Sequence, residues 1–248
     1  MRISAPDAAR AALDAYAAPG RSALVRVRTA GVDWESGVEP DQPYRAASLL
    51  KLGIAIAVED GMQDGRIDPD AEITVRELRA RPDENSVTDL LNPSTILRLR
   101  DALALMIGAS DNTCARWLSS IVGSAGEPEA ARTGLTTCRE ALDLLRTAAD
   151  RQQYPLTAHA LRHSIRNSRI PLGATDADVS IAHKTGSLSG LAHDVALIEC
   201  DAGVAEIAFL TDHQHDTLVT GYAMGICTRE VLTAWGLAAR STVSVDGE

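Results

Sequence analysis

The sequence predicts an α+β fold, in which an antiparallel sheet flanked by helices is joined to an all-helical lobe. Runs typical of strands occur near both ends of the chain: residues 22–29 alternate, and residues 193–200 and 204–211 are separated by a hairpin signal. The middle carries apolar stretches with helical spacing, and the pattern changes again after Pro171. We therefore expect residues 1–45 and 171–248 to form a sheet lobe and residues 46–170 to form a helical lobe, within one continuous unit.

The first elements are predicted to be a helix and a hairpin. Residues 6–17 repeat apolar side chains at helical spacing, which indicates an amphipathic helix. Residues 22–29 alternate as a strand, Ala30-Gly31 favours a turn, and residues 32–36 return as a second strand. This hairpin supplies two strands of the predicted sheet.

The helical lobe is predicted to begin with a buried helix. The positions after Ser48 are apolar nearly all round, which is typical of a buried helix, and Gly61 and Gly65 favour its end. Residues 97–109 indicate a second apolar helix and residues 113–122 a third. Asp111 precedes the third helix, where a carboxylate caps the backbone well, so we interpret it as structural.

Two further helices, at about 137–150 and 156–168, complete the predicted lobe. Thr137 and Glu140 have the spacing of a capping box, so Glu140 is interpreted as a helix cap rather than as a catalytic acid. The remaining expected elements are three strands and a closing helix, at residues 179–187, 193–200, 204–211 and about 218–237.

The composition favours a small-molecule or peptide partner. A net charge of −10 disfavours nucleic-acid binding, because the phosphate backbone requires a basic face. The first residues lack the apolar core of an export signal and no later run is long enough to cross a membrane, so the chain is predicted to be cytoplasmic unless a signal has been removed. The cysteines show no C-x-x-C spacing and are interpreted as buried free thiols, with no metal or other cofactor expected. They are Cys114, Cys138, Cys200 and Cys227.

Lysine is rare in this chain, which makes its two lysines conspicuous. Of the 24 Lys and Arg residues, only Lys51 and Lys184 are lysines. An ammonium is compact and can lose its proton, whereas an arginine cannot be deprotonated in a protein. Lys51 lies three residues after Ser48, so the two side chains share the first turn of the predicted buried helix. Burial lowers the pKa of a lysine, which is how Lys51 could become a base for the Ser48 hydroxyl.

Three short motifs occur in a fixed order along the chain. They are Ser48-x-x-Lys51 at the start of a buried helix, Ser110-Asp111-Asn112 between two helices, and Lys184-Thr185-Gly186 at the end of a strand. Each is weak alone, but their order and structural contexts together are specific. The chain therefore resembles the serine β-lactamase and penicillin-binding-protein superfamily, and class A β-lactamases most closely. The resemblance extends over nearly the whole chain.

The resemblance implies catalytic roles for the first two motifs. Ser48 is the expected nucleophile and Lys51 the base or proton relay for acylation. Ser110 is similar to the family's shuttle serine, which carries a proton to the leaving nitrogen. Asn112 is expected to orient Lys51 and to bind the amide side chain of the substrate.

The third motif is expected to bind the substrate. Lys184 and Thr185 offer donors to a substrate carboxylate, and Lys184 also places a positive charge near the base. Gly186 lets the substrate backbone lie against the strand. The backbone N–H groups of Ser48 and Ser187 are expected to form an oxyanion hole.

The chain departs from class A β-lactamases where their deacylating glutamate lies on a long loop. Only about residues 123–136 remain for that loop, and the Glu-x-x-Leu-Asn signature is absent. Glu127 and Glu129 are the only acids there. A displaced base at either position is one interpretation, and solvated residues in the first turn of a short helix are the interpretation we favour. The leading prediction is therefore a serine hydrolase that forms an acyl-enzyme and turns over lactams poorly. A non-hydrolysing penicillin-binding module and a serine-dependent glutaminase remain alternatives.

Two histidines and two tryptophans are not assigned to the chemistry. His183 and His193 flank the third motif and are interpreted as packed or rim residues of strands rather than as bases. Trp117 and Trp235 fall within helical patterns and are expected in the core.

Overall fold

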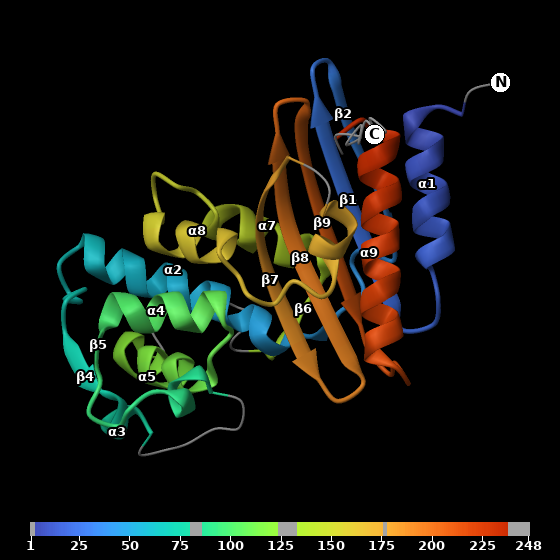
Figure 1. Ribbon diagram of the computed structural model, residues 1–248. Helices are drawn as coiled ribbons and strands as arrows, with labels where there is room; N and C mark the ends of the chain where they lie inside the picture. Colours follow the sequence, from blue (N-terminus) through green and yellow to red (C-terminus); the bar gives the residue numbers. More distant parts are fainter. Residues whose placement is uncertain (1–2, 80–85, 124–132, 176–177, 238–248) are drawn as a thin grey trace, which may run out of the picture.

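A five-stranded antiparallel sheet forms the centre of the molecule (Figure 1). The computed structural model describes residues 3–79, 86–123, 133–175 and 178–237. The sheet has the order β2-β1-β9-β8-β7. This architecture confirms the predicted α+β class. The strands are β1 (Arg21–Thr29), β2 (Val32–Val38), β7 (Ser180–Leu188), β8 (Leu191–Cys200) and β9 (Gly203–Thr211).

Strand pairing joins the two ends of the chain. β1 pairs with β9, with Val25 opposite Ile207, and β9 pairs with β8, with Ile207 opposite Ala196. These three residues belong to one buried cluster, because side chains opposite each other on neighbouring strands point to the same face of the sheet. The segments predicted as strands at the two ends therefore share one sheet.

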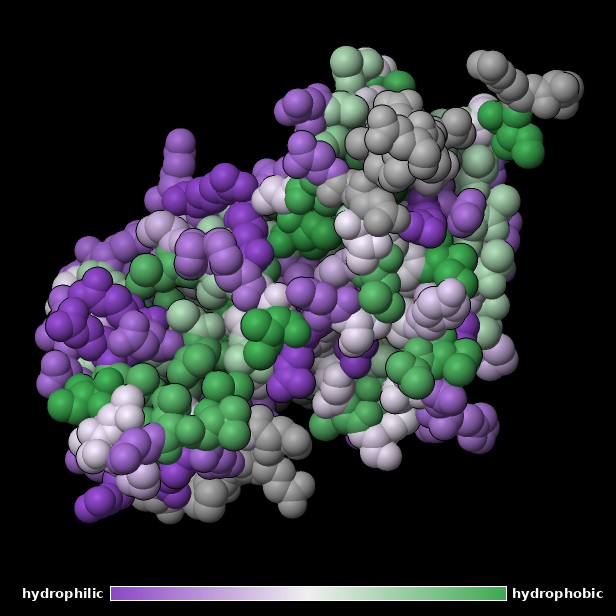
Figure 2. All heavy atoms as spheres, in the orientation of Figure 1, coloured by the Kyte–Doolittle hydropathy of each residue, from purple (hydrophilic) through white to green (hydrophobic). Residues whose placement is uncertain are grey.

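Two helices cover one face of the sheet. They are α1 (Ala5–Tyr16) and α9 (Thr217–Ala234), which lie side by side in Figure 1. The Ser4 side chain caps α1 and Asp216 caps α9, so both helices begin where side-chain oxygens satisfy their first N–H groups. The sheet-facing side of α9 is buried, whereas its outer face exposes apolar side chains (Figure 2). The exposed residues are Leu218, Val219, Tyr222 and Ile226.

Five of the described helices occupy the other side of the sheet and share one large apolar core. The Thr137–Glu140 capping box predicted for the fourth of them is present. These helices are α2 (Leu50–Gln63), α4 (Leu99–Gly108), α5 (Asn112–Val122), α7 (Cys138–Ala148) and α8 (Pro155–Arg162).

Short elements complete the described chain and connect the larger ones. They are β3 (Tyr44–Arg45), η1 (Ala47–Leu49), β4 (Glu72–Thr74), α3 (Val75–Leu78), η2 (Val87–Leu90), β5 (Ile96–Arg98), β6 (Leu135–Thr136) and η4 (Ile170–Ala174). Within the described ranges, no helix is long and apolar enough to cross a membrane.

Three boundary predictions were wrong. Leu97 does not begin a helix, because it pairs with Ile73 in the β4–β5 ladder and α4 starts at Leu99. α8 ends at Arg162 rather than near residue 168. Gly61 lies inside α2, and it is Gly65, with a φ of 75°, that follows the end of the helix. The glycine at 61 is explained by packing, since a Cβ there would lie 2.5 Å from Ile67 Cδ1.

Candidate active site

The nucleophile candidate lies at a tight turn between the sheet and the helical core. Ser48 is in η1, which runs directly into α2, where Lys51 occupies the first turn. Ala47 has a φ of 48°, in the left-handed region that costs a residue with a Cβ about 1–2 kcal/mol. Ser48 is half-buried and Lys51 is 5% exposed, and both line one cavity. The structure therefore brings the predicted serine and lysine together at a strained turn.

Lys51 is held by the second motif. Its Nζ donates to the Ser110 carbonyl oxygen at 2.6 Å and to Asn112 Oδ1 at 2.5 Å, and lies 3.3 Å from Ser110 Oγ. Ser110 has a φ of 59°, and this left-handed turn between α4 and α5 points both its carbonyl and its hydroxyl at the lysine. Lys51 is thus in contact with both residues of the second motif that were predicted to act with it.

Lys184 approaches the same serine from the sheet. Its Nζ donates to Ser110 Oγ at 2.9 Å and to the Thr185 carbonyl oxygen at 2.9 Å, and the side chain is 1% exposed. Burial holds the pKa of Lys184 well below its usual range, and the nearby positive charge of Lys51 lowers it further. The Ser110 hydroxyl therefore bridges two buried amines, an arrangement suited to passing a proton.

Asp111 points away from this cluster. Its carboxylate accepts hydrogen bonds from the backbone of Cys114 and Val87 and from the Ser86 hydroxyl. Burial acts to raise its pKa, but the Cys114, Ser86 and Val87 donors outweigh it and the pKa of Asp111 is lowered. The cap predicted for Asp111 is confirmed, and it fixes the start of α5 that carries Asn112.

Two adjoining cavities of about 420 and 190 Å³ meet at Ser48. Both are also lined by Asn112 and Ser187, while Ser110 and Thr185 line only the smaller. The described lining includes the cations Lys51, Arg116 and Arg166 but no carboxylate. Apolar residues form much of the larger cavity, namely Leu50, Ile54, Ala115 and Leu188. The cleft is therefore suited to an anionic ligand that also carries an apolar group.

Two arginines at the cleft were not singled out from the sequence. Arg166 lines the smaller cavity, and its Nε donates to the Ala109 carbonyl oxygen at 3.1 Å. Arg169 donates to the Gly186 carbonyl oxygen at 2.9 Å and to Ser187 Oγ at 2.6 Å. It therefore holds the end of β7 that carries the third motif.

The two unassigned histidines are packed residues, as interpreted from the sequence. His183 is buried with its Nδ1 3.0 Å from Asp194 Oδ1, and His193 is fully buried. Trp117 and Trp235 were predicted to lie in the core. They are only partly buried and pack against the edges of the apolar clusters. Cys114, Cys138 and Cys227 are buried free thiols and Cys200 is half-buried.

The remaining questions about the site concern the two loop glutamates and the presence of metal-binding side chains. Glu127 and Glu129 lie outside the described residues. Among the residues that are described, no three His, Cys, Asp or Glu side chains gather in a way that could hold a metal ion.

Comparisons with solved structures show the fold. A β-lactamase from Sphaerobacter thermophilus DSM 20745 superposes with a TM-score of 0.79 at 24% identity, covering 94% of this chain and 97% of that one. A class A β-lactamase from Mycobacterium abscessus gives 0.77 at 20% identity, covering 94% and 99%. A mutant of PBP-A in acyl-enzyme complex with penicillin G gives 0.76 at 19% identity, covering 92% and 96%.

Family membership follows from the sequence comparison. No curated protein matches the chain. The family model described as the β-lactamase enzyme family matches residues 7–127 and 124–235, which together form most of the sequence. The chain therefore belongs to the β-lactamase enzyme family.

Proposed function

We propose that this chain is a serine hydrolase of the β-lactamase type, which forms an acyl-enzyme on Ser48 with a carboxylate-bearing lactam, amide or ester. The observation that carries the proposal is the cluster in which Ser110 Oγ accepts from both Lys51 and Lys184 beside the Ser48 cavity. A serine hydroxyl is too weakly acidic to attack unaided, and this cluster supplies an amine and a hydroxyl through which its proton can leave.

In acylation, Lys51 first gives up its own proton, and Ser48 Oγ then attacks the carbonyl carbon of the substrate while its proton passes to the Lys51 amine. The carbonyl electron pair moves to the oxygen, where the N–H groups of Ser48 and Ser187 stabilise the negative charge. The electron pair then re-forms the carbonyl and the bond to the leaving nitrogen breaks. Ser110 gives its proton to that nitrogen and takes one from the protonated Lys51, so the amine is neutral again.

The substrate carboxylate is assigned to the smaller cavity. Thr185 and Arg166 line it, and Lys184 lies directly behind, bonded to Ser110. A hydroxyl and cationic donors around one cavity suit a carboxylate. The apolar side of the larger cavity then receives the acyl group.

Deacylation is proposed to be slow. Hydrolysis of an acyl-enzyme requires a group that activates water, and none of the described residues lining either cavity is a carboxylate. This observation favours, as the second candidate, a penicillin-binding module that retains the acyl group. Glutaminase activity is less well supported, and assay of ammonia release from glutamine tests it.

Mass spectrometry after mixing with penicillin G tests the proposal. We expect the protein to gain the mass of the intact drug, and Ser48→Ala to gain none. No adduct on the wild type, or the same adduct on Ser48→Ala, would refute it. Following the adduct over time, beside turnover of a chromogenic lactam, separates the hydrolase from the retaining module.

A further inference from the structure

His193 connects the turn that carries Ser48 to the centre of the sheet. The side chain belongs to β8, is fully buried, and is not among the residues that line the two cavities at Ser48. Its Nε2 lies 2.8 Å from the carbonyl oxygen of Arg45, three residues before the nucleophile. The backbone N–H of Thr211, on β9, donates to its Nδ1 at 3.1 Å.

These two partners determine the protonation state of the ring. A backbone N–H can only donate, so Nδ1 must present a lone pair to Thr211. A carbonyl oxygen can only accept, so Nε2 must carry the proton that it donates to Arg45. The neutral Nε2–H tautomer alone satisfies both bonds. Burial, with the nearby charge of Arg169, lowers the pKa of His193 to about 4, which keeps the ring neutral near pH 7.

The same ring also touches the strand that carries the third motif. A Cβ built on Gly186 would lie 3.1 Å from His193 Cδ2 and 3.3 Å from Ala47 Cβ. Gly186 is thus enclosed between the imidazole and the residue before Ser48. Arg169 donates to the carbonyl oxygens of Gly186, on β7, and of His193, on β8. The imidazole therefore hydrogen-bonds the segment before Ser48, through the Arg45 carbonyl, and packs against β7 at Gly186.

We infer that His193 is a positioning residue that sets the spacing between the Ser48 turn and the Gly186–Ser187 segment. This role rests on the proposed function, because those two segments supply the N–H groups proposed for the oxyanion hole. Such donors act only within about 2.7–3.1 Å of the developing oxyanion, so a shift of either wall weakens them. His193 does not touch the substrate, and it acts through the Arg45 carbonyl and the Gly186 backbone.

Two amide variants separate the two hydrogen bonds of the ring. His193→Asn places an amide near Nδ1, so it keeps an acceptor for Thr211 and loses the donor to Arg45. His193→Gln reaches the position of Nε2, so it keeps the donor to Arg45 and loses the acceptor for Thr211. Both remove the imidazole from the core, so each is the matched control for the other in stability.

Acylation kinetics with penicillin G, followed by mass spectrometry, give the test. We expect His193→Asn to lower the acylation rate constant at saturation by about 10- to 100-fold, because misplaced groups lose rate steeply. His193→Gln should lower it by no more than about 3-fold, although thermal melting shows similar destabilisation of both. The half-saturating concentration should stay within about 2-fold, because the carboxylate site is untouched.

The possible contrary results point to different failures. Equal losses of rate in the two variants, or wild-type acylation by folded His193→Asn, would overturn the positioning role while the proposed function stands. Absence of an adduct on the wild-type protein would overturn the proposed function and this role with it.

Discussion

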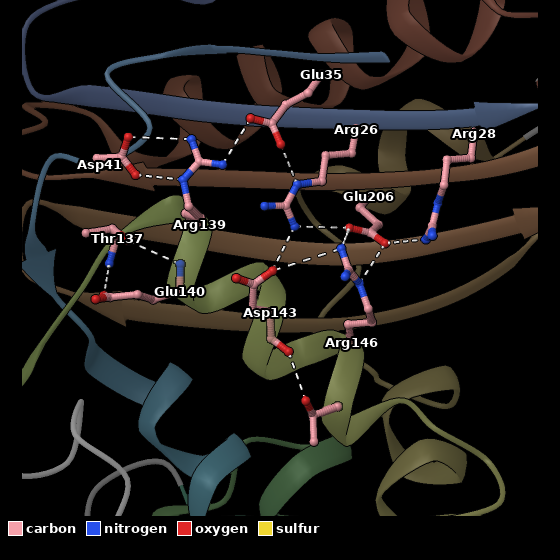
Figure 3. A network of polar contacts seen from close by, with 11 residues as sticks. Arg26, Arg28, Glu35, Asp41, Thr137, Arg139, Glu140, Asp143, Arg146 and Glu206 are labelled. Carbon is pink, nitrogen blue, oxygen red and sulfur yellow. Dashed lines mark hydrogen bonds and ion pairs between the residues drawn. The ribbon is translucent and has the colours of Figure 1, made fainter. Parts of the chain in front are cut away.

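Two clusters of charged side chains, one around Glu206 on the sheet and one around Lys184 in the cleft, compensate their buried charges to different degrees. On the sheet, the Glu206 side chain is 3% exposed and accepts from Arg146 at 2.6 and 3.0 Å and from Arg28 at 2.7 Å, with Arg26 at 3.4 Å (Figure 3). In the cleft, the equally buried Lys184 donates to a hydroxyl and to a carbonyl oxygen.

The difference shows what each cluster contributes. Around Glu206 the buried carboxylate is compensated by several cations, which tie β1, β9 and α7 together and favour the folded state. In the cleft, Lys184 has a second amine, Lys51, as its neighbour, and burial beside that charge lowers its pKa. Incomplete compensation costs stability and makes a proton easier to remove. Substitutions in the cleft should therefore change rate, and substitutions at Glu206 should change stability.

Replacing Lys51 should give the largest effect. We expect Lys51→Met to slow acylation by about 10²–10⁴-fold, the usual contribution of a general base. The free energy of unfolding should change by no more than about 1 kcal/mol, because the hydrogen bonds lost are offset by removal of a buried charge. Adduct formation measured beside urea unfolding checks both.

Lys51→Arg is the matched control for that substitution. It keeps a positive charge but cannot give up a proton, so it should be as slow as Lys51→Met. Near wild-type acylation by Lys51→Arg would contradict the role of Lys51 as a base.

Lowering the pH should reduce the free energy of unfolding through protonation of His193. The pKa of His193 is about 4 in the folded protein and 6.5 for an ordinary histidine, so the unfolded chain binds the proton first. Stability from the neutral ring is fully present above pH 6.5 and is lost as the pH falls toward 4, by about 3 kcal/mol in total. Urea unfolding at pH 7 and pH 4.5 measures the loss, and comparison with His193→Gln removes the contribution of the carboxylates. An equal loss in the two proteins would contradict the assignment.

Removing the charge of Glu206 should destabilise the folded protein without lowering its acylation rate. We expect Glu206→Gln to lower the free energy of unfolding by about 2 kcal/mol, less than for a fully buried pair because its arginines are partly exposed. Acylation should stay within about 2-fold of wild type. Glu199→Gln is the control, since its side chain is 37% exposed and should cost less than about 1 kcal/mol. A fall in acylation rate with unchanged stability would contradict the assignment of the Glu206 cluster to stability rather than to rate.

Much of the cleft could be predicted because its parts have local signals. The Asp111 cap depends on residues three positions apart, and Ser48 and Lys51 are three positions apart across the junction of η1 and α2, so short spacings are enough. β1 also carries its signal within its own length, because apolar and polar residues alternate over residues 25–28. By contrast, β5 was missed because a three-residue strand is stabilised by its partner β4 rather than by its own pattern.

The long-range contacts had no such signal. Arg166 and Arg169 could not be distinguished from the other arginines of an arginine-rich chain, although the two lysines could. His193 was interpreted as a packed or rim residue because Arg45 and Thr211, which determine its tautomer, lie far away in sequence. Only the fold brings them together.

Replacing Arg166 should give the smallest effect, and it should change the affinity for the substrate rather than the rate or the stability. Its side chain is exposed, so solvent and salt screen its charge, yet it lines the smaller cavity and its charge lowers the pKa of Lys184. We expect Arg166→Gln to raise the half-saturating concentration of penicillin G by about 3- to 10-fold, with little change in the rate constant at saturation. Arg166→Lys should restore part of the affinity, and 1 M salt should reduce the difference between wild type and Arg166→Gln. If only the rate constant at saturation fell, Arg166 would act in the acylation step, like the buried lysines, and not in carboxylate binding.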